Sequence, residues 1–263
     1  MAAPGIFKNK YVLITGGSSG IGFELARLFL KEEAKIILAA GNADKLSKAA
    51  QSLESEFNVR VFSIAKDLSQ PEAAGQIHQE LASKLIPVDV LVNNAGFGIS
   101  GLFKDADLNK TLRMIELNAK APVALTGLFL PYMVHNGFGK SLNIASTAAF
   151  QGIPLEALYA ASKAFIVNFS EGLAEELKGT GVGVTCLCPG ATDTPFFDRG
   201  TIVASKVMKR SMMTSRRVAQ IGLDALKNNR RLVIAGLRNK ILILSERLVP
   251  RKLATKLAGR MVR

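Results

Sequence analysis

Residues 11–22 read YVLITGGSSGIG, a compact apolar run that leads into a glycine-rich junction. The run at 11–15 is rich in β-branched and apolar residues, which predicts a buried strand. From Ile21 onward apolar residues recur at helical spacing, so the glycines lie between a strand and a helix. Glycine allows a tight turn and a close backbone approach, and the free N–H groups of a helix start attract phosphate. The stretch therefore predicts a dinucleotide-binding strand–turn–helix unit.

Apolar runs and helical segments alternate along the rest of the chain. Further strands are predicted at 35–39, 59–64, 88–96, 141–146, 182–187 and 232–235, and helices lie between them, among them 43–57, 71–84 and 108–135. This order predicts an α/β fold of the doubly wound Rossmann type, with a seven-stranded, mostly parallel sheet and helices on both faces. We assign it to residues 1–238, and we interpret 239–263 as a basic amphipathic C-terminal extension of the same domain.

Composition favours a globular protein. The 263 residues are 48% hydrophobic and 21% charged, which suits a single domain with a substantial core. The start of the chain lacks a secretory leader pattern, and the longest uncharged apolar segment, 121–134, is too short to span a bilayer. We therefore expect a cytoplasmic protein. Cys186 and Cys188 lie two apart in a predicted strand, and we expect buried structural thiols and no metal site.

The end of the second strand bears on the choice of cofactor. In a dinucleotide-binding unit an acid at this place binds the 2′-hydroxyl of NAD, and a basic residue suits the 2′-phosphate of NADP. The residues here are Ala39, Ala40, Gly41 and Asn42, so neither signal is present. Because no acid repels a phosphate and Lys45 follows one turn later, we favour NADP(H) over NAD(H).

A proton-transfer site is predicted within residues 141–178. Ser146 ends a strand, and Tyr159 and Lys163 lie four apart on one face of the following helix. A free tyrosine has a pKa of about 10, which is high for a base at neutral pH. An ammonium about 5 Å away, at an effective dielectric of about 20, lowers it by roughly two units. We therefore expect Lys163 to bring the Tyr159 pKa toward the range of acid/base catalysis.

These motifs together resemble the short-chain dehydrogenase/reductase family. The chain shows, in the family's order, TGGSSGIG (15–22), Asp67-Leu68, NNAG (93–96), Asn118, Ser146, YAASK (159–163) and Pro189-Gly190. Within the family it looks most like the bacterial DltE-like oxidoreductases, because of NNAGFG (93–98), LYAASKAF (158–165) and SEGLAEEL (170–177). The resemblance covers nearly the whole chain and names no substrate.

The resemblance implies roles for individual residues. Tyr159 is expected to be the general acid/base, and Ser146 to orient and polarise the substrate carbonyl. Lys163 is expected to bind the nicotinamide ribose, and Asn118 to hold a water in a proton relay. The expected cofactor contacts, some from the residues and some from the resemblance, are Gly16, Ser18, Ser19, Gly20, Ile21, Gly22, Asn42, Lys45, Asp67, Leu68, Asn94, Ala95, Gly96, Tyr159, Lys163, Pro189, Gly190, Thr192 and Thr194. A homodimer or homotetramer, formed through the helices carrying Asn118 and Tyr159, is also implied.

The substrate is expected to be an apolar small-molecule carbonyl or secondary alcohol, bound by loops at the strand ends. Candidate pocket residues are Phe97, Ile99, Phe150, Ile153, Leu155, Phe196, Phe197, Met208, Met212 and Met213. The enzyme hypothesis competes with a non-catalytic dinucleotide-binding redox sensor or scaffold, which would not require Ser146, Tyr159 and Lys163 together.

The excess of positive charge belongs to the end of the chain. Residues 199–263 hold 17 Lys/Arg against two acids, whereas 1–198 hold 17 against 19. Leucines at four-residue spacing in 240–263 predict short amphipathic helices with basic polar faces. Three interpretations stay open: the extension packs on the body, lies on an anionic membrane surface, or contacts an acidic partner. Nucleic-acid binding is not expected, since no aromatic platform or recognition helix accompanies the charge.

Overall fold

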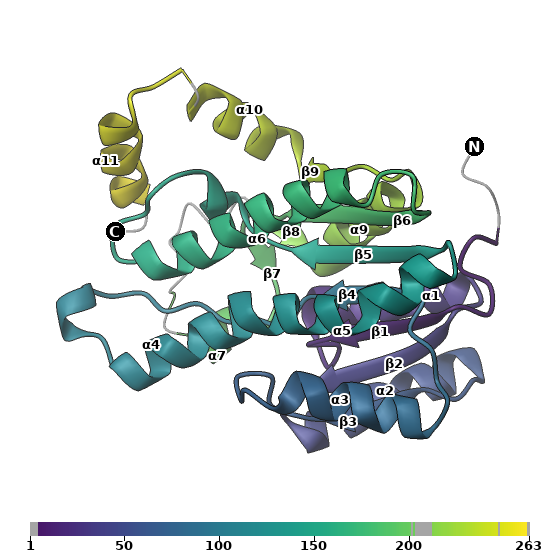
Figure 1. Ribbon diagram of the computed structural model, residues 1–263. Helices are drawn as coiled ribbons and strands as arrows, with labels where there is room; N and C mark the ends of the chain where they lie inside the picture. The colour runs from purple at the N-terminus through teal and green to yellow at the C-terminus, as the bar shows by residue number, and fades with distance from the viewer. Residues whose placement is uncertain (1–4, 201, 203–211, 247, 262–263) are drawn as a thin grey trace.

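Seven strands form one parallel sheet in the order β3-β2-β1-β4-β5-β6-β9, as the computed structural model shows for residues 5–200, 202, 212–246 and 248–261 (Figure 1). The strands are β1 (Tyr11–Thr15), β2 (Lys35–Ala40), β3 (Phe62–Ala65), β4 (Val90–Asn93), β5 (Gly139–Ile144), β6 (Val182–Cys188) and β9 (Leu232–Ile234). Every neighbouring pair runs parallel. The predicted doubly wound sheet of seven strands is confirmed.

Helices cover both faces of the sheet. The longer ones are α1 (Gly20–Lys31), α2 (Ala43–Phe57), α3 (Ala73–Ser83), α4 (Leu108–Ile115), α5 (Ala121–His135), α6 (Ala157–Glu176), α9 (Ser215–Lys227), α10 (Leu237–Glu246) and α11 (Arg251–Met261). One core layer joins α1, α2 and α9 to the sheet, and a second joins α3, α5 and α6 to the opposite face. Figure 1 shows α3, α5 and α6 in front of the strands.

Short elements complete the chain. They are the 3₁₀ helices η1 (Phe103–Asp105) and η3 (Thr147–Phe150), the π-helical turn η2 (Glu116–Lys120), α7 (Phe196–Arg199), and the two-stranded parallel sheet of β7 (Thr192–Asp193) and β8 (Met213–Thr214). In the described part of the chain, no helix is both long enough and apolar enough to cross a membrane.

Burial of both sheet faces explains the apolar runs. In β1, Val12 and Ile14 pack with α1 and α2, whereas Leu13 between them packs with the opposite layer. All three side chains are fully buried. Because successive strand residues point to opposite faces, a strand covered on both sides must be apolar at every position.

Several predicted elements differ from the structure in their bounds; the strand predicted at 88–96, for example, extends only over Val90–Asn93. The third strand begins at Phe62 and not at 59, because Asn58 ends α2 in the left-handed conformation and the Val61 N–H bonds the Glu54 side chain at 2.9 Å. The helix predicted over 108–135 is interrupted by the π-helical turn at 116–120. Pro122 has no N–H, so the carbonyl of Asn118 lacks the donor that α-helical pairing would supply.

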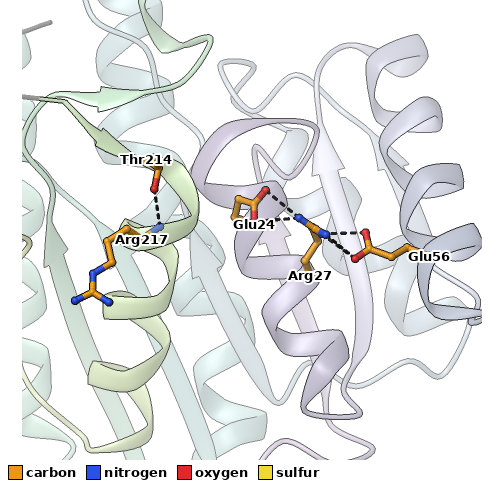
Figure 2. A network of polar contacts seen from close by, with 5 residues as sticks. All are labelled: Glu24, Arg27, Glu56, Thr214 and Arg217. Atoms are coloured by element: carbon orange, nitrogen blue, oxygen red, sulfur yellow. Dashed lines mark hydrogen bonds and ion pairs between the residues drawn. The ribbon is translucent and has the colours of Figure 1, made fainter. Parts of the chain in front are cut away.

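Polar side chains hold the first helices together (Figure 2). Arg27 of α1 makes a two-pronged contact with Glu56 of α2, with Nη2–Oε1 at 2.6 Å and Nε–Oε2 at 2.9 Å. Paired hydrogen bonds of this kind are stronger than a single contact. At α9, the Thr214 hydroxyl caps the helix by accepting from the Arg217 N–H at 3.3 Å. The Arg27–Glu56 contact links α1, whose N-terminus borders the site, to α2.

Candidate active site

The glycine-rich turn is pressed against the end of β4. Gly16 has a φ of 64°, and a Cβ there would lie 2.9 Å from Ala95 Cα. The Asn94 side chain donates to the Thr15 carbonyl at 2.8 Å, and the Thr15 hydroxyl accepts from the Asn94 N–H at 2.9 Å. A Cβ on Gly22 would lie 2.5 Å from Asn94 Nδ2. Glycine is therefore required where the turn packs on the neighbouring strand end.

The N-terminus of α1 suits an anion. Its N-cap residue, Ser19, makes no side-chain capping bond, and the first turn carries no acid. Gly20 has a φ of 58°, and a Cβ there would lie 3.0 Å from Thr194 Cγ2. This turn lies at β1, where the strand order reverses between β1 and β4 and where open α/β sheets bind nucleotides. Backbone N–H groups and the helix dipole at this place fit a pyrophosphate.

Ser146, Tyr159 and Lys163 come together at the carboxyl end of β5. The Ser146 hydroxyl hydrogen-bonds the Tyr159 phenol, and it also accepts from the Ala148 N–H at 3.1 Å. Lys163 Nζ donates to the Ile144 carbonyl at 3.0 Å and lies 6.0 Å from the centroid of the Tyr159 ring. Tyr159 and Lys163 are buried in the first two turns of α6. The predicted trio is thus assembled in space.

The charge states differ from the expectation. Burial raises the pKa of Tyr159 to about 12, and the Ser146 hydrogen bond offsets this only in part. Burial lowers the pKa of Lys163 to about 8. The expected lowering of the Tyr159 pKa by Lys163 is therefore wrong, because desolvation of the phenolate dominates and the Ser146 hydrogen bond, not the ammonium, is the group that opposes it. The phenol is protonated at neutral pH.

Asn118 organises the loop after β4. It is fully buried in the π-helical turn; its Nδ2 donates to the Phe97 carbonyl at 2.9 Å and to Ser162 Oγ at 3.2 Å. Its Oδ1 accepts from the Phe97 N–H at 3.2 Å. A Cβ on Gly96 would lie 2.9 Å from this oxygen and 3.4 Å from Lys163 Nζ. The Asn118 carboxamide thus hydrogen-bonds the Phe97 backbone. The main-chain carbonyl of Asn118 lacks its α-helical donor, because Pro122 has no N–H.

The residues expected around the adenosine lie at the ends of β2 and β3. Asn42 caps α2 by accepting from the Lys45 N–H at 2.8 Å, and the Lys45 side chain is exposed. Although burial opposes it, hydrogen bonds from Ser69 and the charge of Arg113 hold the pKa of Asp67 below its usual value. Asp67 is 3.4 Å from a Cβ built on Gly41, so these two strand ends adjoin. The Leu68 side chain is buried in the core.

A cavity of about 250 Å³ joins the glycine-rich turn to the proton-transfer trio. Among the predicted site residues, those lining it are Gly16, Ser19, Gly20, Ile21, Asn94, Ala95, Gly96, Ser146, Tyr159, Lys163, Pro189, Gly190, Thr192 and Thr194. Ser18, Gly22, Asn42, Lys45, Asp67, Leu68 and Asn118 do not line it. The cavity therefore covers the space beside the trio and the glycine-rich turn, but not the adenosine end.

Only part of the expected substrate wall borders this cavity. Ile153, Phe196 and Phe197 line it, together with Ile202. Phe97 and Ile99 pack beside Tyr159, whereas Phe150 and Met213 pack in other clusters of the core. Leu155 and Met212 are described but are not in the lining, and Met208 lies outside the described residues.

Sequence reasoning missed several lining residues. Gln151, Glu156 and Glu246 add polar groups to a wall that was expected to be apolar. Glu156 stands three residues before Tyr159, a helical spacing that signals a shared face. Leu242, Ile243, Glu246 and Ala258 come from the C-terminal helices, and no local pattern places them beside Tyr159.

The C-terminal helices pack on the body beside the cavity. Ile243 and Ala258 are buried, and a Cβ on Gly259 would lie 2.9 Å from Pro154 Cγ. In Figure 1, α10 and α11 arch over the end of the molecule that carries the start of α6. Their outer surface exposes Leu237, Ile241, Leu244, Leu248, Leu253 and Leu257. The first of the three interpretations, packing on the body, describes the observed contact.

The two cysteines are structural. Cys186 and Cys188 are both fully buried and unpaired by a disulfide, with their Sγ atoms 4.0 Å apart. Among the described residues no group of three or more His, Cys, Asp or Glu side chains is arranged to hold a metal. The expectation of buried thiols is confirmed.

Comparisons with known proteins agree with this geometry. The family model of the short chain dehydrogenases matches residues 10–201. The chain is 31% identical to "Ketoacyl reductase HetN" of a Nostoc species over 87% of this chain and 79% of that protein. A short-chain dehydrogenase from Sphingobium yanoikuyae, solved with NADPH, superposes with a TM-score of 0.81 at 29% identity, covering 90% of this chain and 94% of the other. The L-sorbose reductase of Gluconobacter frateurii, solved with NADPH and L-sorbose, gives 0.78 at 29%, covering 89% and 98%.

A parallel sheet with a glycine-rich turn at its strand-order reversal, and a Ser–Tyr–Lys trio at the next strand end, defines a dinucleotide-dependent oxidoreductase. The chain belongs to the short-chain dehydrogenase/reductase family. The predicted class, an NAD(P)-dependent oxidoreductase, is confirmed, and the non-catalytic alternative is not favoured.

Proposed function

We propose that the protein transfers hydride between NADP(H) and an apolar ketone or secondary alcohol, with Tyr159 as the general acid/base. The observation that carries this proposal is the contact of the Ser146 hydroxyl with the Tyr159 phenol, beside Lys163, in a cavity that continues to the glycine-rich turn. The bound nicotinamide would supply or accept the hydride.

The protein groups supply the proton and the orientation. Ser146 and Tyr159 both donate hydrogen bonds to the carbonyl oxygen, which draws charge away from the reacting carbon. As the C–O double bond becomes a single bond, the phenol proton passes to that oxygen. Burial raises the pKa of Tyr159 to about 12, so the phenol holds this proton at neutral pH. In the direction of oxidation the same groups act in reverse, and the phenolate accepts the proton.

Lys163 and Asn118 are proposed to replace that proton. Lys163 Nζ is anchored to the Ile144 carbonyl at 3.0 Å, on the side of Tyr159 toward β5. Burial lowers the pKa of Lys163 to about 8, so it exchanges protons more readily than an exposed lysine. The Asn118 carbonyl, without an α-helical donor because of Pro122, is the group that would hold a relay water.

The residues at the turn fit the pyrophosphate of a dinucleotide. Gly16, Gly20 and Gly22 allow the backbone approach, and the first turn of α1 carries no acid that would repel a phosphate. The preference for NADP(H) is supported by the absence of an acid at the end of β2 and by the exposed Lys45 at the start of α2. The acidic side chain of Asp44 is exposed in the same turn. The preference between NADP(H) and NAD(H) therefore depends on the balance between the charges of Lys45 and Asp44.

The assembly and the location stay proposals. Exposed Leu108 and Leu112 on α4, Val123 and Tyr132 on α5, and Phe165 on α6 form apolar faces on the helices expected to pair. We propose a homodimer or homotetramer through them, to be checked by light scattering of the native protein and of Phe165→Glu.

We also propose that the protein is cytoplasmic. Its main body comprises residues 1–238, and its C-terminal extension, residues 239–263, is proposed to contact anionic membrane surfaces.

The decisive experiment compares the wild type with Tyr159→Phe over a panel of ketones and alcohols, followed at the nicotinamide absorbance. Loss of the phenol is expected to lower kcat by about 10²–10⁴-fold, while NADPH binding, measured by fluorescence, changes little. Tyr132→Phe on the exposed surface of α5 is the matched control. Full activity in Tyr159→Phe, or no turnover of any carbonyl by the wild type, would overturn the proposal.

A further inference from the structure

Three side-chain oxygens beside the active site are buried and unpaired. They belong to Gln151 (Oε1), Glu156 (Oε1) and Glu246 (Oε2), and none has a hydrogen-bond partner within the described residues. All three side chains line the cavity that holds Tyr159. A buried acceptor without a donor costs roughly 1–3 kcal/mol, and where it lines a cavity a ligand or a water can supply the missing bond.

Glu156 is the central member of this group. Its side chain is 4% exposed, and it stands at the N-cap of α6 without making a capping bond. Its main-chain groups are used elsewhere: the N–H donates to the Ile153 carbonyl at 3.1 Å, and the carbonyl accepts from Ala160 at 2.9 Å. The carboxyl therefore has no structural task at the helix start.

The other two oxygens come from separate elements. Gln151 follows η3, and Glu246 ends α10, in the C-terminal extension. Gln151 and Glu156 lie five residues apart in the connection between η3 and α6, whereas Glu246 reaches the same cavity from the C-terminal extension, which no local pattern in the sequence explains. The apolar remainder of that wall includes Ile153, Phe196, Ile202 and Ile243. Among the described residues that line the cavity, Lys163 is the one with a positively charged side chain. Its ammonium donates a hydrogen bond to the Ile144 carbonyl.

We propose that Gln151, Glu156 and Glu246 form a polar recognition site for a hydroxyl group on the substrate, separate from the carbonyl or alcohol that reacts. The inference rests on the proposed function, because it takes Tyr159 as the reacting end of the cavity. Glu156 precedes Tyr159 by three residues and both side chains line the same cavity, so one substrate molecule can meet both. The substrate is a hydroxy-ketone, or the matching diol, with an apolar skeleton.

A hydroxyl fits this site better than a cation. Burial raises the pKa of Glu156 to about 7, and burial also raises the pKa of Glu246, which stands at the unfavourable C-terminal end of a helix dipole. A hydroxyl donates a hydrogen bond to an unpaired carboxyl oxygen whether or not that carboxyl is protonated. An ammonium would need at least one ionised carboxyl as its partner, and burial disfavours the ionised form of both.

The test uses the full-length protein with matched ketones that share one carbon skeleton and differ in one remote substituent: methyl, hydroxyl or ammonium. We expect the wild type to prefer the hydroxyl ketone over the methyl ketone by about 10-fold or more in kcat/KM. Glu156→Leu should reduce this preference at least 5-fold, mainly through KM. Glu156→Gln, which keeps an acceptor, should retain most of it. Glu176→Leu, at the exposed far end of α6, is the control.

The outcomes separate this inference from the function on which it rests. Equal turnover of the methyl and hydroxyl ketones by the wild type overturns the recognition site and leaves the oxidoreductase proposal intact. Preference for the ammonium ketone, lost in Glu156→Gln, overturns the hydroxyl assignment. If Glu156→Leu does not fold by circular dichroism, Glu246→Leu on α10 replaces it, with the same expected loss of preference. Calorimetric titration of the matching diol into Tyr159→Phe, compared with Tyr159→Phe/Glu156→Leu, should show the same loss without turnover.

Discussion

Glu156 occupies the N-cap position of the helix in whose first turn Tyr159 lies, without a side-chain capping bond, and the two side chains are coupled electrostatically. Burial is the main cause that raises the pKa of Tyr159, and the charge of Glu156 raises it further. Burial also raises the pKa of Glu156 to about 7. A carboxyl that ionises near neutral pH thus adjusts the proton affinity of the catalytic phenol.

The same carboxyl links stability to pH. Its pKa is near 4.5 in the unfolded chain and about 7 in the fold, so the folded state binds more protons between these values. Stability contributed by Glu156 is therefore present below pH 4.5 and is lost as the pH rises toward 7, by up to roughly 3 kcal/mol. Glu156→Gln should raise the melting temperature more at pH 8 than at pH 4.5.

Thermal unfolding at the two pH values measures this effect. Glu176→Gln, on the exposed end of the same helix, should show no such difference. An equal gain at both pH values would mean that the carboxyl is not desolvated in the fold.

Gly22 is expected to tolerate no side chain. A Cβ there would lie 2.5 Å from Asn94 Nδ2 and 2.6 Å from the Gly16 carbonyl oxygen, so Gly22→Ala must displace the turn. We predict loss of about 1–3 kcal/mol of stability and at least 10-fold weaker NADPH binding. Gly75→Ala on α3, where a Cβ meets nothing within 4 Å, should be neutral or stabilising by about 0.5–1 kcal/mol. Unfolding and fluorescence titration provide both values, and equal behaviour of the two variants would contradict the packing.

Lys45 is predicted to set the nucleotide preference. Reversal of its charge in Lys45→Glu places two acids in the first turn of α2 and repels a 2′-phosphate. The ratio of the Kd for NADPH to that for NADH should rise by about 5-fold or more, with the NADH value changing less. Lys48→Glu, one turn further along the same exposed face, makes the same change in net charge and is the control. An equal effect of both variants would indicate a general electrostatic influence and no local contact.

The outer surface of the C-terminal helices is predicted to bind anionic membranes. Leu244 and Leu248 are exposed, and Lys240, Arg251 and Lys252 are exposed on the same segment. Each basic residue near such a surface contributes about 1 kcal/mol. The protein should cosediment with phosphatidylserine vesicles and not with neutral ones, and Leu244→Ser/Leu248→Ser should reduce the bound fraction several-fold. Because Ile243 and Ala258 pack inward, this double variant should keep its melting temperature. Equal sedimentation of both proteins would exclude the membrane contact.

Local patterns determined much of the fold. The strand, glycine-rich turn and helix at 11–31, the alternation of strands and helices, and the spacing of Ser146, Tyr159 and Lys163 are each visible in the sequence. They are visible because strand burial, helix periodicity and backbone turns depend on residues close together in the chain. The π-helical turn around Asn118 was missed, although Pro122 was the local signal for it.

Only the tertiary structure decided the chemistry around the trio. Burial raises the pKa of Tyr159 and lowers that of Lys163, because desolvation depends on everything that surrounds a group and not on its neighbour four residues away. Glu246 and Ile243 reach the cavity from the end of the chain, about a hundred residues from Ser146 in sequence. The sequence by itself determined that Tyr159 sits in a dinucleotide-binding fold, and the long-range packing of α10 and α11 decided the shape and polarity of the space in front of it.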